Sequence, residues 1–194
     1  MSITNTDMQK SYNLERVILL SSVAALGGFL FGFDSGVING TIDALATGFD
    51  SDSATTGFNV ASVLLGSMVG AFFAGTWADK YGRKPIMIIT AILFIASAWG
   101  SGIANASLPF ILSGVIGGIA MGAASVLAPV YISEIAPHQI RGRLATLQQL
   151  MIVIGLFMAF MSNYWLAGMT GGASIELWWG FDTWRWMFWM EIRV

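Results

Sequence analysis

The chain has 194 residues, of which 56% are hydrophobic and only 10% are charged. A soluble domain of this size normally carries about a quarter charged residues, so the composition indicates a polytopic membrane protein. The net charge of −2 offers no basic surface for nucleic acid, and the absence of cysteine excludes disulfides, thiolate metal sites and cysteine catalysis.

The chain begins with a polar tail, residues 1–16, which we expect to be cytoplasmic. A hydrocarbon core of about 30 Å requires roughly 20 apolar residues in a helix. Five runs reach this length, and a sixth starts near Thr183 but stops at Val194, too soon to cross. The predicted spans are residues 17–40, 57–78, 85–104, 109–133 and 144–168, with a partial span at 183–194. Each is expected to be helical, because in lipid every backbone amide must be satisfied within its own segment.

Lysine and arginine are distributed unevenly between the predicted loops. With the N-terminus inside, seven of the nine basic residues are cytoplasmic: Lys10, Arg16, Lys80, Arg83, Lys84, Arg141 and Arg143. The opposite loops, about 41–56, 105–108 and 169–182, contain no basic residue. The positive-inside rule therefore predicts a multi-pass protein of the plasma (cell) membrane with a cytoplasmic N-terminus.

Small residues recur every four positions in three of the spans. They are Gly28, Gly32, Gly36 and Gly40, then Gly66, Gly70 and Ala74, then Gly114, Gly118 and Gly122. This spacing lines one helix face and allows close helix contacts. Two interpretations remain open: general helix association, and contacts that also slide during a transport cycle.

The first cytoplasmic turn, WADKYGRKP (77–85), concentrates four charges in six positions. Gly82 allows a tight turn. Asp79 lies near the end of a helix whose dipole disfavours a negative charge, so a facing cation would stabilise it. The turn resembles the loop motif of the major facilitator superfamily, in which Asp and Arg brace the cytoplasmic side of one state. The alternative is that the basic residues only fix the orientation.

The second cytoplasmic stretch, PVYISEIAPHQIRGRL (129–144), makes the resemblance more specific. It is similar to the loop of the sugar porter family, which reads Tyr-x-x-Glu-x-x-Pro-x-x-x-Arg-Gly. The matching residues are Tyr131, Glu134, Pro137, Arg141 and Gly142. FGFDSGVING (31–40) resembles the first span of that family, and WRWMF (184–188) resembles its sixth.

The resemblance implies the fold and the mechanism. The chain is expected to be all-α, forming the N-terminal six-helix bundle of a major facilitator fold with an incomplete sixth helix. In the family, two such halves enclose a midplane sugar site and rock around it. The resemblance also implies a cytoplasmic gating network of four charged residues, Asp79, Arg83, Glu134 and Arg141.

Asp34 is the acidic residue within the first span, where an unpaired charge facing lipid is costly. In proton-coupled members of the family the matching Asp carries the coupling proton. Those members have an Arg in the fourth span, where this chain has Gly114. Three roles stay open for Asp34: proton coupling, a bond to the helix backbone, and contact with a substrate hydroxyl. Uniport and symport both stay open.

Gln149 lies at the start of the apolar part of the fifth span, and its amide suits paired sugar hydroxyls. It matches a family glutamine that contacts sugar, and Phe31 matches a family aromatic residue that lies against the sugar ring. The resemblance therefore implies substrate binding by Gln149 and Phe31. A second family glutamine is replaced by Leu156. A purely interhelical role for Gln149 is the alternative, and Gln148 is expected to point about 100° away.

The resemblance implies transport of a sugar or polyol, and neither an enzyme activity, a metal nor a cofactor is expected. The family's sixth span continues after the glutamate matching Glu191, whereas this sequence reads EIRV (191–194). We therefore expect a fragment of a secondary transporter. Two alternatives are a half-transporter that assembles with a separate C-terminal half or with itself, and a non-transporting membrane sensor or scaffold.

Overall fold

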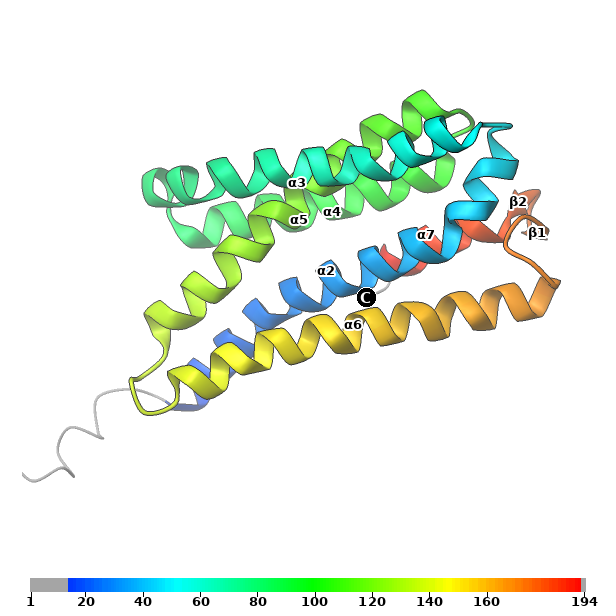
Figure 1. Cartoon of the computed structure of the whole chain (residues 1–194). Helices are drawn as coiled ribbons and strands as arrows, with labels where there is room; N and C mark the ends of the chain where they lie inside the picture. Colours follow the sequence, from blue (N-terminus) through cyan, green and yellow to red (C-terminus); the bar gives the residue numbers. More distant parts are fainter. Residues whose placement is uncertain (1–13, 193–194) are drawn as a thin grey trace, which may run out of the picture.

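The computed structural model of this chain describes residues 14–192 (Figure 1). Most of the predicted tail, residues 1–13, and the last two residues of the partial span lie outside the described residues. The described elements are α2 (Leu14–Gly48), α3 (Ser53–Tyr81), α4 (Arg83–Ile103), α5 (Ser107–Ile135), α6 (Arg141–Thr170), β1 (Glu176–Trp178), β2 (Phe181–Asp182) and α7 (Thr183–Ile192). The long helices run side by side along a common direction, so their connections gather at two ends of a bundle (Figure 1).

Five helices, α2 to α6, are long and apolar enough to cross a membrane. They overlap the five predicted spans, but most extend beyond the apolar runs. The expected loop at 41–56 is wrong in its first half, because α2 continues to Gly48. There the hydroxyls of Thr41 and Thr47 donate to main-chain carbonyls four residues earlier, at 3.1 and 2.9 Å. These bonds from side chain to backbone allow α2 to continue through polar residues.

The glycine stripes are the places where helices meet. α2 packs chiefly against α6, and α3 packs chiefly against α5. A Cβ atom on Gly32 would collide with the carbonyl oxygen of Ile152, and one on Gly66 with that of Val115. Only glycine permits backbones to approach so closely. Helix association is therefore confirmed as a role of these stripes, and sliding stays a prediction.

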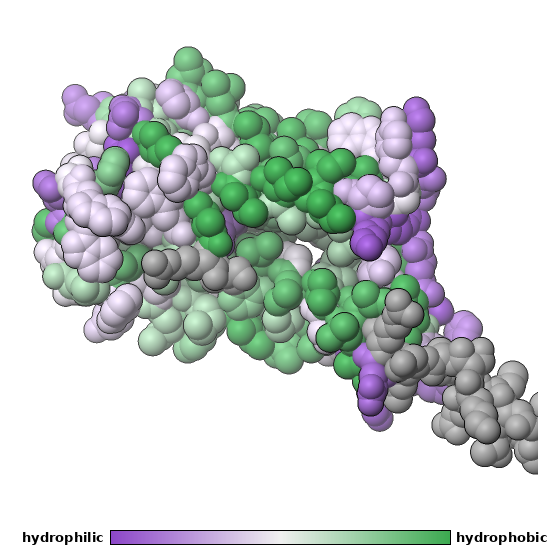
Figure 2. All heavy atoms as spheres, turned by 180° about the vertical axis from the view of Figure 1, so that it is seen from behind, coloured by the Kyte–Doolittle hydropathy of each residue, from purple (hydrophilic) through white to green (hydrophobic). Residues whose placement is uncertain are grey.

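The bundle has two distinct ends. The basic end carries the α3–α4 turn at Gly82 and the α5–α6 connection at residues 136–140; the hairpin end carries β1 and β2. Figure 2 shows hydrophobic residues over the middle of the molecule, strongly hydrophilic residues at both ends, and pale aromatic rings at the hairpin end. This distribution matches a chain whose middle faces hydrocarbon.

The short helix α7 is held at the hairpin end by aromatic and polar contacts. Trp184 is fully buried, and the ring of Phe110 lies 5.6 Å from that of Phe188. The Arg185 guanidinium donates to the carbonyl of Gly102 and to Oδ1 of Asn105, both at 3.1 Å. These bonds connect α7 to the last turn of α4 and to the segment between α4 and α5.

A two-stranded antiparallel hairpin, absent from the sequence-based expectation, precedes α7. Glu176 pairs with Asp182, and Trp178 pairs with Phe181. The two turn residues, Trp179 and Gly180, both have positive φ angles, of 57° and 79°. Such a two-residue turn matches the twist of the strands it joins.

Candidate sugar-binding pocket and charge network

A pocket of about 240 Å³ lies between the halves of α2, α5 and α6 that are nearer the basic end. Its lining combines two amide side chains and an aromatic ring with small residues. The lining residues are Gly28, Phe31, Ser125, Pro129, Ala145, Gln148, Gln149 and Ile152. The two predicted substrate residues, Phe31 and Gln149, are therefore brought together.

Gln148 and Gln149 differ in burial, as their 100° separation on α6 predicts. Gln148 is only 6% exposed, and its Oε1 atom has no hydrogen-bond partner within residues 14–192. Gln149 is exposed. Despite this difference both residues line the pocket. Gln148 is therefore a further candidate for substrate binding, although from the sequence only Gln149 was expected to have this role.

Gln148 occupies this position because of helix phase. It belongs to a stripe on α6 that continues through Gly155, Ala159 and Asn163, all of them buried. Glycines of α2 face this stripe: a Cβ on Gly28 would lie 3.1 Å from Cγ of Gln148. The spacing of small residues on α6 was thus the signal that identifies Gln148 as the inward-facing glutamine.

The opposite wall supplies further polar atoms. Pro129 lies inside α5 and has no N–H, so the Ser125 carbonyl loses its usual helical donor. Amide groups offer donors and acceptors, and an aromatic ring offers an apolar face. Together these groups can bind a small molecule that carries several hydroxyls on a compact ring.

Asp34 does not line this pocket. Its side chain is buried in α2, with the residue 8% exposed, and it forms no ion pair within the described part of the chain. A Cβ on Gly114 would lie 2.9 Å from the hydroxyl oxygen of Ser62 and 3.2 Å from Val63, so this position faces α3. Glu191 on α7 is a second buried carboxylic acid, with the residue 6% exposed.

The charge network at the basic end unites three of its four predicted members. Nη2 of Arg83 lies 2.9 Å from Oδ1 of Asp79 and 2.9 Å from Oε1 of Glu134. Arg141 is not joined to them: its Nη2 donates to the Ala136 carbonyl at 3.4 Å, and its Nε has no partner among residues 14–192.

The one-residue connection between α3 and α4 creates this geometry. Gly82 has a φ angle of 91°, which a side chain rarely adopts, and it lets α4 start directly after α3. Asp79 thus lies near the C-terminus of one helix and Arg83 at the N-terminus of the next. Each charge is disfavoured by its own helix dipole, so the ion pair offsets both effects.

Comparison with known sequences supports the resemblance found in the motifs. The sequence model of the family described as sugar (and other) transporter matches residues 20–194. The chain is 50% identical over 193 residues to the glucose transport protein of Synechocystis sp., covering 99% of this chain and 41% of that protein. It is 36% identical to the D-xylose-proton symporter of Escherichia coli K12, covering 93% of this chain and 41% of that protein. The chain thus spans about two fifths of the length of these relatives, which are named as transporters and not as enzymes.

Solved structures agree with the sequence matches. The xylose transporter XylE from E. coli in an inward open conformation aligns with a TM-score of 0.81 at 36% identity, covering 90% of this chain and 45% of that chain. The same transporter bound to 6-bromo-6-deoxy-D-glucose aligns with a TM-score of 0.83 at 35% identity, covering 93% of this chain and 42% of that chain. The chain is therefore an integral membrane protein with a major facilitator fold, and it belongs to the sugar (and other) transporter family.

Proposed function

We propose that this chain forms the N-terminal half of a transporter that moves a sugar or polyol by alternating access. The pocket between α2, α5 and α6 is the observation that carries the proposal, because it gathers Gln148, Gln149 and Phe31 around one cavity. The names of the relatives, a glucose transport protein and a D-xylose-proton symporter, support a monosaccharide as the substrate.

The chemistry of the pocket supports hydroxyl recognition by both glutamines. Oε1 of Gln148 has no partner in the described part of the chain, so it is a buried acceptor that a sugar hydroxyl can satisfy. A buried acceptor without a partner costs about 1–3 kcal/mol, so binding a hydroxyl there is favoured. Gln149 extends the same polar surface towards the exposed side of the bundle.

The exposure of Gln149 also supports a partner that completes the pocket. A polar side chain on a membrane-spanning helix is unfavourable against hydrocarbon, and such residues face a bundle interior or a water-filled cavity. We propose that a second half-transporter, either a C-terminal half or another copy, covers this side. The substrate would then be enclosed between the two halves.

The cytoplasmic network is proposed to act as a gate. The bonds that join Arg83 to Asp79 and Glu134 connect α3, α4 and α5 at one end of the bundle. Exposed ion pairs of this kind contribute little individually, so they can break and re-form at modest cost as the transporter changes state. Arg141 is proposed to join the network in a different state, since it lies at the same end.

Asp34 is proposed to carry a coupling proton. Its burial without an ion pair among residues 14–192 supports this role, because an ionisable residue inside a span is costly and is commonly part of a proton pathway. A symporter among the relatives supports the same proposal.

The orientation is proposed to be N-terminus cytoplasmic in the plasma membrane, supported by the basic residues of the two turns at the basic end.

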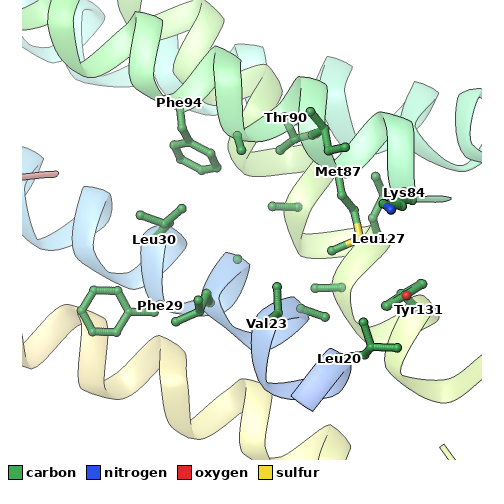
Figure 3. Close-up of a pocket in the computed structure, with 17 residues that line it drawn as sticks. Leu20, Val23, Phe29, Leu30, Lys84, Met87, Thr90, Phe94, Leu127 and Tyr131 are labelled. Carbon is green, nitrogen blue, oxygen red and sulfur yellow. The ribbon is translucent and has the colours of Figure 1, made fainter. Parts of the chain in front are cut away.

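We further propose that α7 is the first part of a sixth spanning helix. It has ten residues, whereas a span requires roughly 20. An apolar groove of about 640 Å³, lined by α2, α4 and α5, supports this proposal (Figure 3). Phe94 and Leu30 border the groove. Phe94 belongs to the core that contains Met187 of α7, and Leu30 packs against that core, whereas Lys84 and Tyr131 lie at the other end of the groove (Figure 3).

The test is counterflow of radiolabelled D-glucose and D-xylose into proteoliposomes. The chain would be reconstituted alone and together with a separately expressed C-terminal half from a relative. Counterflow that requires both halves and is lost in Gln149→Ala supports the proposal. No counterflow of either sugar, with both halves shown to be assembled by native electrophoresis, would contradict it.

A further inference from the structure

The hairpin end carries a group of tryptophans that the transport site does not use. Trp178 and Trp179 belong to the hairpin of β1 and β2, which we call the tryptophan hairpin. Trp179 is 85% exposed, more than any other large hydrophobic side chain in the described part of the chain. Thr170, where α6 ends, lies 21 residues after Gln149 on the same helix, which is about 30 Å at 1.5 Å per residue. The tryptophan hairpin is thus remote from the pocket.

Trp179 is an unusual residue for the conformation that its hairpin turn requires. Its φ angle of 57° lies in the left-handed region, which glycine and asparagine adopt readily and bulky residues rarely adopt. In a two-residue hairpin turn the usual residues are Asn-Gly, whereas this turn has Trp-Gly. A strained residue that persists at an exposed position points to a role for its side chain.

The tryptophan hairpin is rigidly connected to α7. The Thr183 hydroxyl donates to the Ile175 carbonyl at 2.7 Å, and the backbone N–H of Trp184 donates to Ala173 at 2.9 Å. The rings of Trp178 and Trp179 lie 5.4 and 5.8 Å from the ring of Trp186. The position of the exposed ring is therefore fixed relative to the bundle.

The same chain of rings continues to the lipid-facing surface. Trp186 contacts Trp189 at 5.0 Å, and Trp189 stacks on Trp99 of α4 at 5.9 Å. Trp99 is exposed at the end of α4, and Trp165 is exposed near the end of α6. Pale aromatic rings border the hydrophobic middle of the molecule at this end (Figure 2). The hairpin rings thus continue a set of exposed aromatic rings that borders the hydrophobic middle of the molecule.

We propose that the tryptophan hairpin binds the lipid headgroup layer of the leaflet opposite the basic end, and thereby anchors the start of α7. Tryptophan favours this layer because its ring is apolar and its N–H is polar. Arg185 adds no exposed charge there, because its guanidinium is held by Gly102, Asn105 and the nearby Asp182. This proposal does not depend on which substrate, if any, the chain transports.

Fluorine NMR of the full chain labelled with fluorotryptophan tests the proposal in phosphatidylcholine vesicles. The resonance missing from Trp179→Asn identifies Trp179, and asparagine suits the turn, so this variant keeps the hairpin. We expect a nitroxide on the lipid headgroup to at least double the linewidth of this resonance, and an aqueous gadolinium chelate to broaden it less. The buried Trp184, identified with Trp184→Phe, is the control and should respond to neither reagent.

Two results would overturn the proposal. One is broadening of the Trp179 resonance by the aqueous chelate alone. The other is a shift of that resonance on addition of D-glucose or D-xylose but not L-glucose, which would identify the tryptophan hairpin as a sugar-binding surface instead. Trp179→Phe provides a second assignment of the resonance if the asparagine variant is poorly produced.

Discussion

Arg83, the first residue of α4, donates two hydrogen bonds to the same oxygen of Glu134 near the end of α5, from Nη2 at 2.9 Å and from Nε at 3.2 Å. The same guanidinium also pairs with Asp79 of α3. One side chain thus links three helices at the basic end, and the strength of each link can be measured separately.

The Arg83–Glu134 pair should be the stronger of the two. The Glu134 side chain is 45% exposed, whereas that of Asp79 is 70% exposed, and water weakens the interaction of exposed charges. A double-mutant cycle of Arg83→Gln with Glu134→Gln should give a coupling of about 0.2–1 kcal/mol in the free energy of unfolding. The cycle with Asp79→Asn is the matched control, and a larger coupling there would contradict the geometry.

Gly32→Ala should destabilise the bundle. The new methyl group would collide with the Ile152 carbonyl, and separating two packed helices costs about 1–3 kcal/mol. Gly168→Ala on α6 is the control, because its Cβ would meet nothing within 4 Å. Thermal unfolding in detergent should show a lower midpoint for Gly32→Ala than for the unmodified chain. The midpoint of the Gly168→Ala control should not fall. Equal midpoints for both variants would rule out the close contact.

Arg185→Lys should loosen α7, although the charge is retained. Lysine cannot make both planar hydrogen bonds to Gly102 and Asn105, and a bond from a charged group contributes about 1.5–3 kcal/mol. Asn105→Ala removes only one of the two bonds, so its effect on the free energy of unfolding should be smaller. Protease protection of the hairpin should decrease in the same order. An Arg185→Lys protein with an unchanged free energy of unfolding and unchanged protease protection would contradict this role of Arg185.

Asp52 should give the start of α3 an acid-sensitive cap. Hydrogen bonds from Thr55, first from its side chain and then from its backbone N–H, lower the pKa of Asp52 from its ordinary value of 3.8. Because the folded pKa is the lower one, the stabilisation is present above pH 3.8 and disappears as the pH falls through the folded pKa. Hydrogen exchange at Thr55 and Thr56 should therefore accelerate below that pH. Asp52→Asn keeps a capping side chain and should abolish this pH dependence of hydrogen exchange. A pH dependence that persists in Asp52→Asn would show that another group causes it.

Gln148→Leu should separate stability from sugar binding. The substitution removes a buried acceptor that has no partner among residues 14–192, so the free energy of unfolding should stay constant or rise. Sugar affinity should fall by up to about tenfold, because one neutral hydrogen bond contributes roughly 0.5–1.5 kcal/mol. Gln139→Ala, in the exposed α5–α6 connection, is the control for both measurements. A destabilised Gln148→Leu protein with normal affinity would indicate a purely interhelical role.

The spans were predictable because lipid leaves the backbone no alternative to a helix. The helix ends were not, because beyond the hydrocarbon they depend on local bonds. Residues 41–48 continue α2 through threonine hydroxyls, and Asp52 determines where α3 starts. The hairpin was missed since its turn has Trp-Gly in place of the usual Asn-Gly, and its strands contain three and two residues.

The pocket was predictable in part. A polar residue within an apolar run, such as Gln149, is conspicuous in the sequence alone. Which of two adjacent glutamines is buried depends on the phase of α6, which the glycines of α2 set by close approach. The Arg83 network follows from adjacent helix ends, whereas the separate position of Arg141 depends on the path of residues 136–140.

The central claim, that a sugar binds between α2, α5 and α6, can be tested most directly by cysteine protection. The chain has no cysteine, so Ala145→Cys introduces a single thiol in the lining of the pocket. In proteoliposomes that contain both halves, D-glucose or D-xylose should slow maleimide labelling of this thiol, and L-glucose should not. Gly168→Cys, outside the pocket, should label at the same rate with every sugar. Equal labelling of Ala145→Cys with and without these D-sugars would contradict the account.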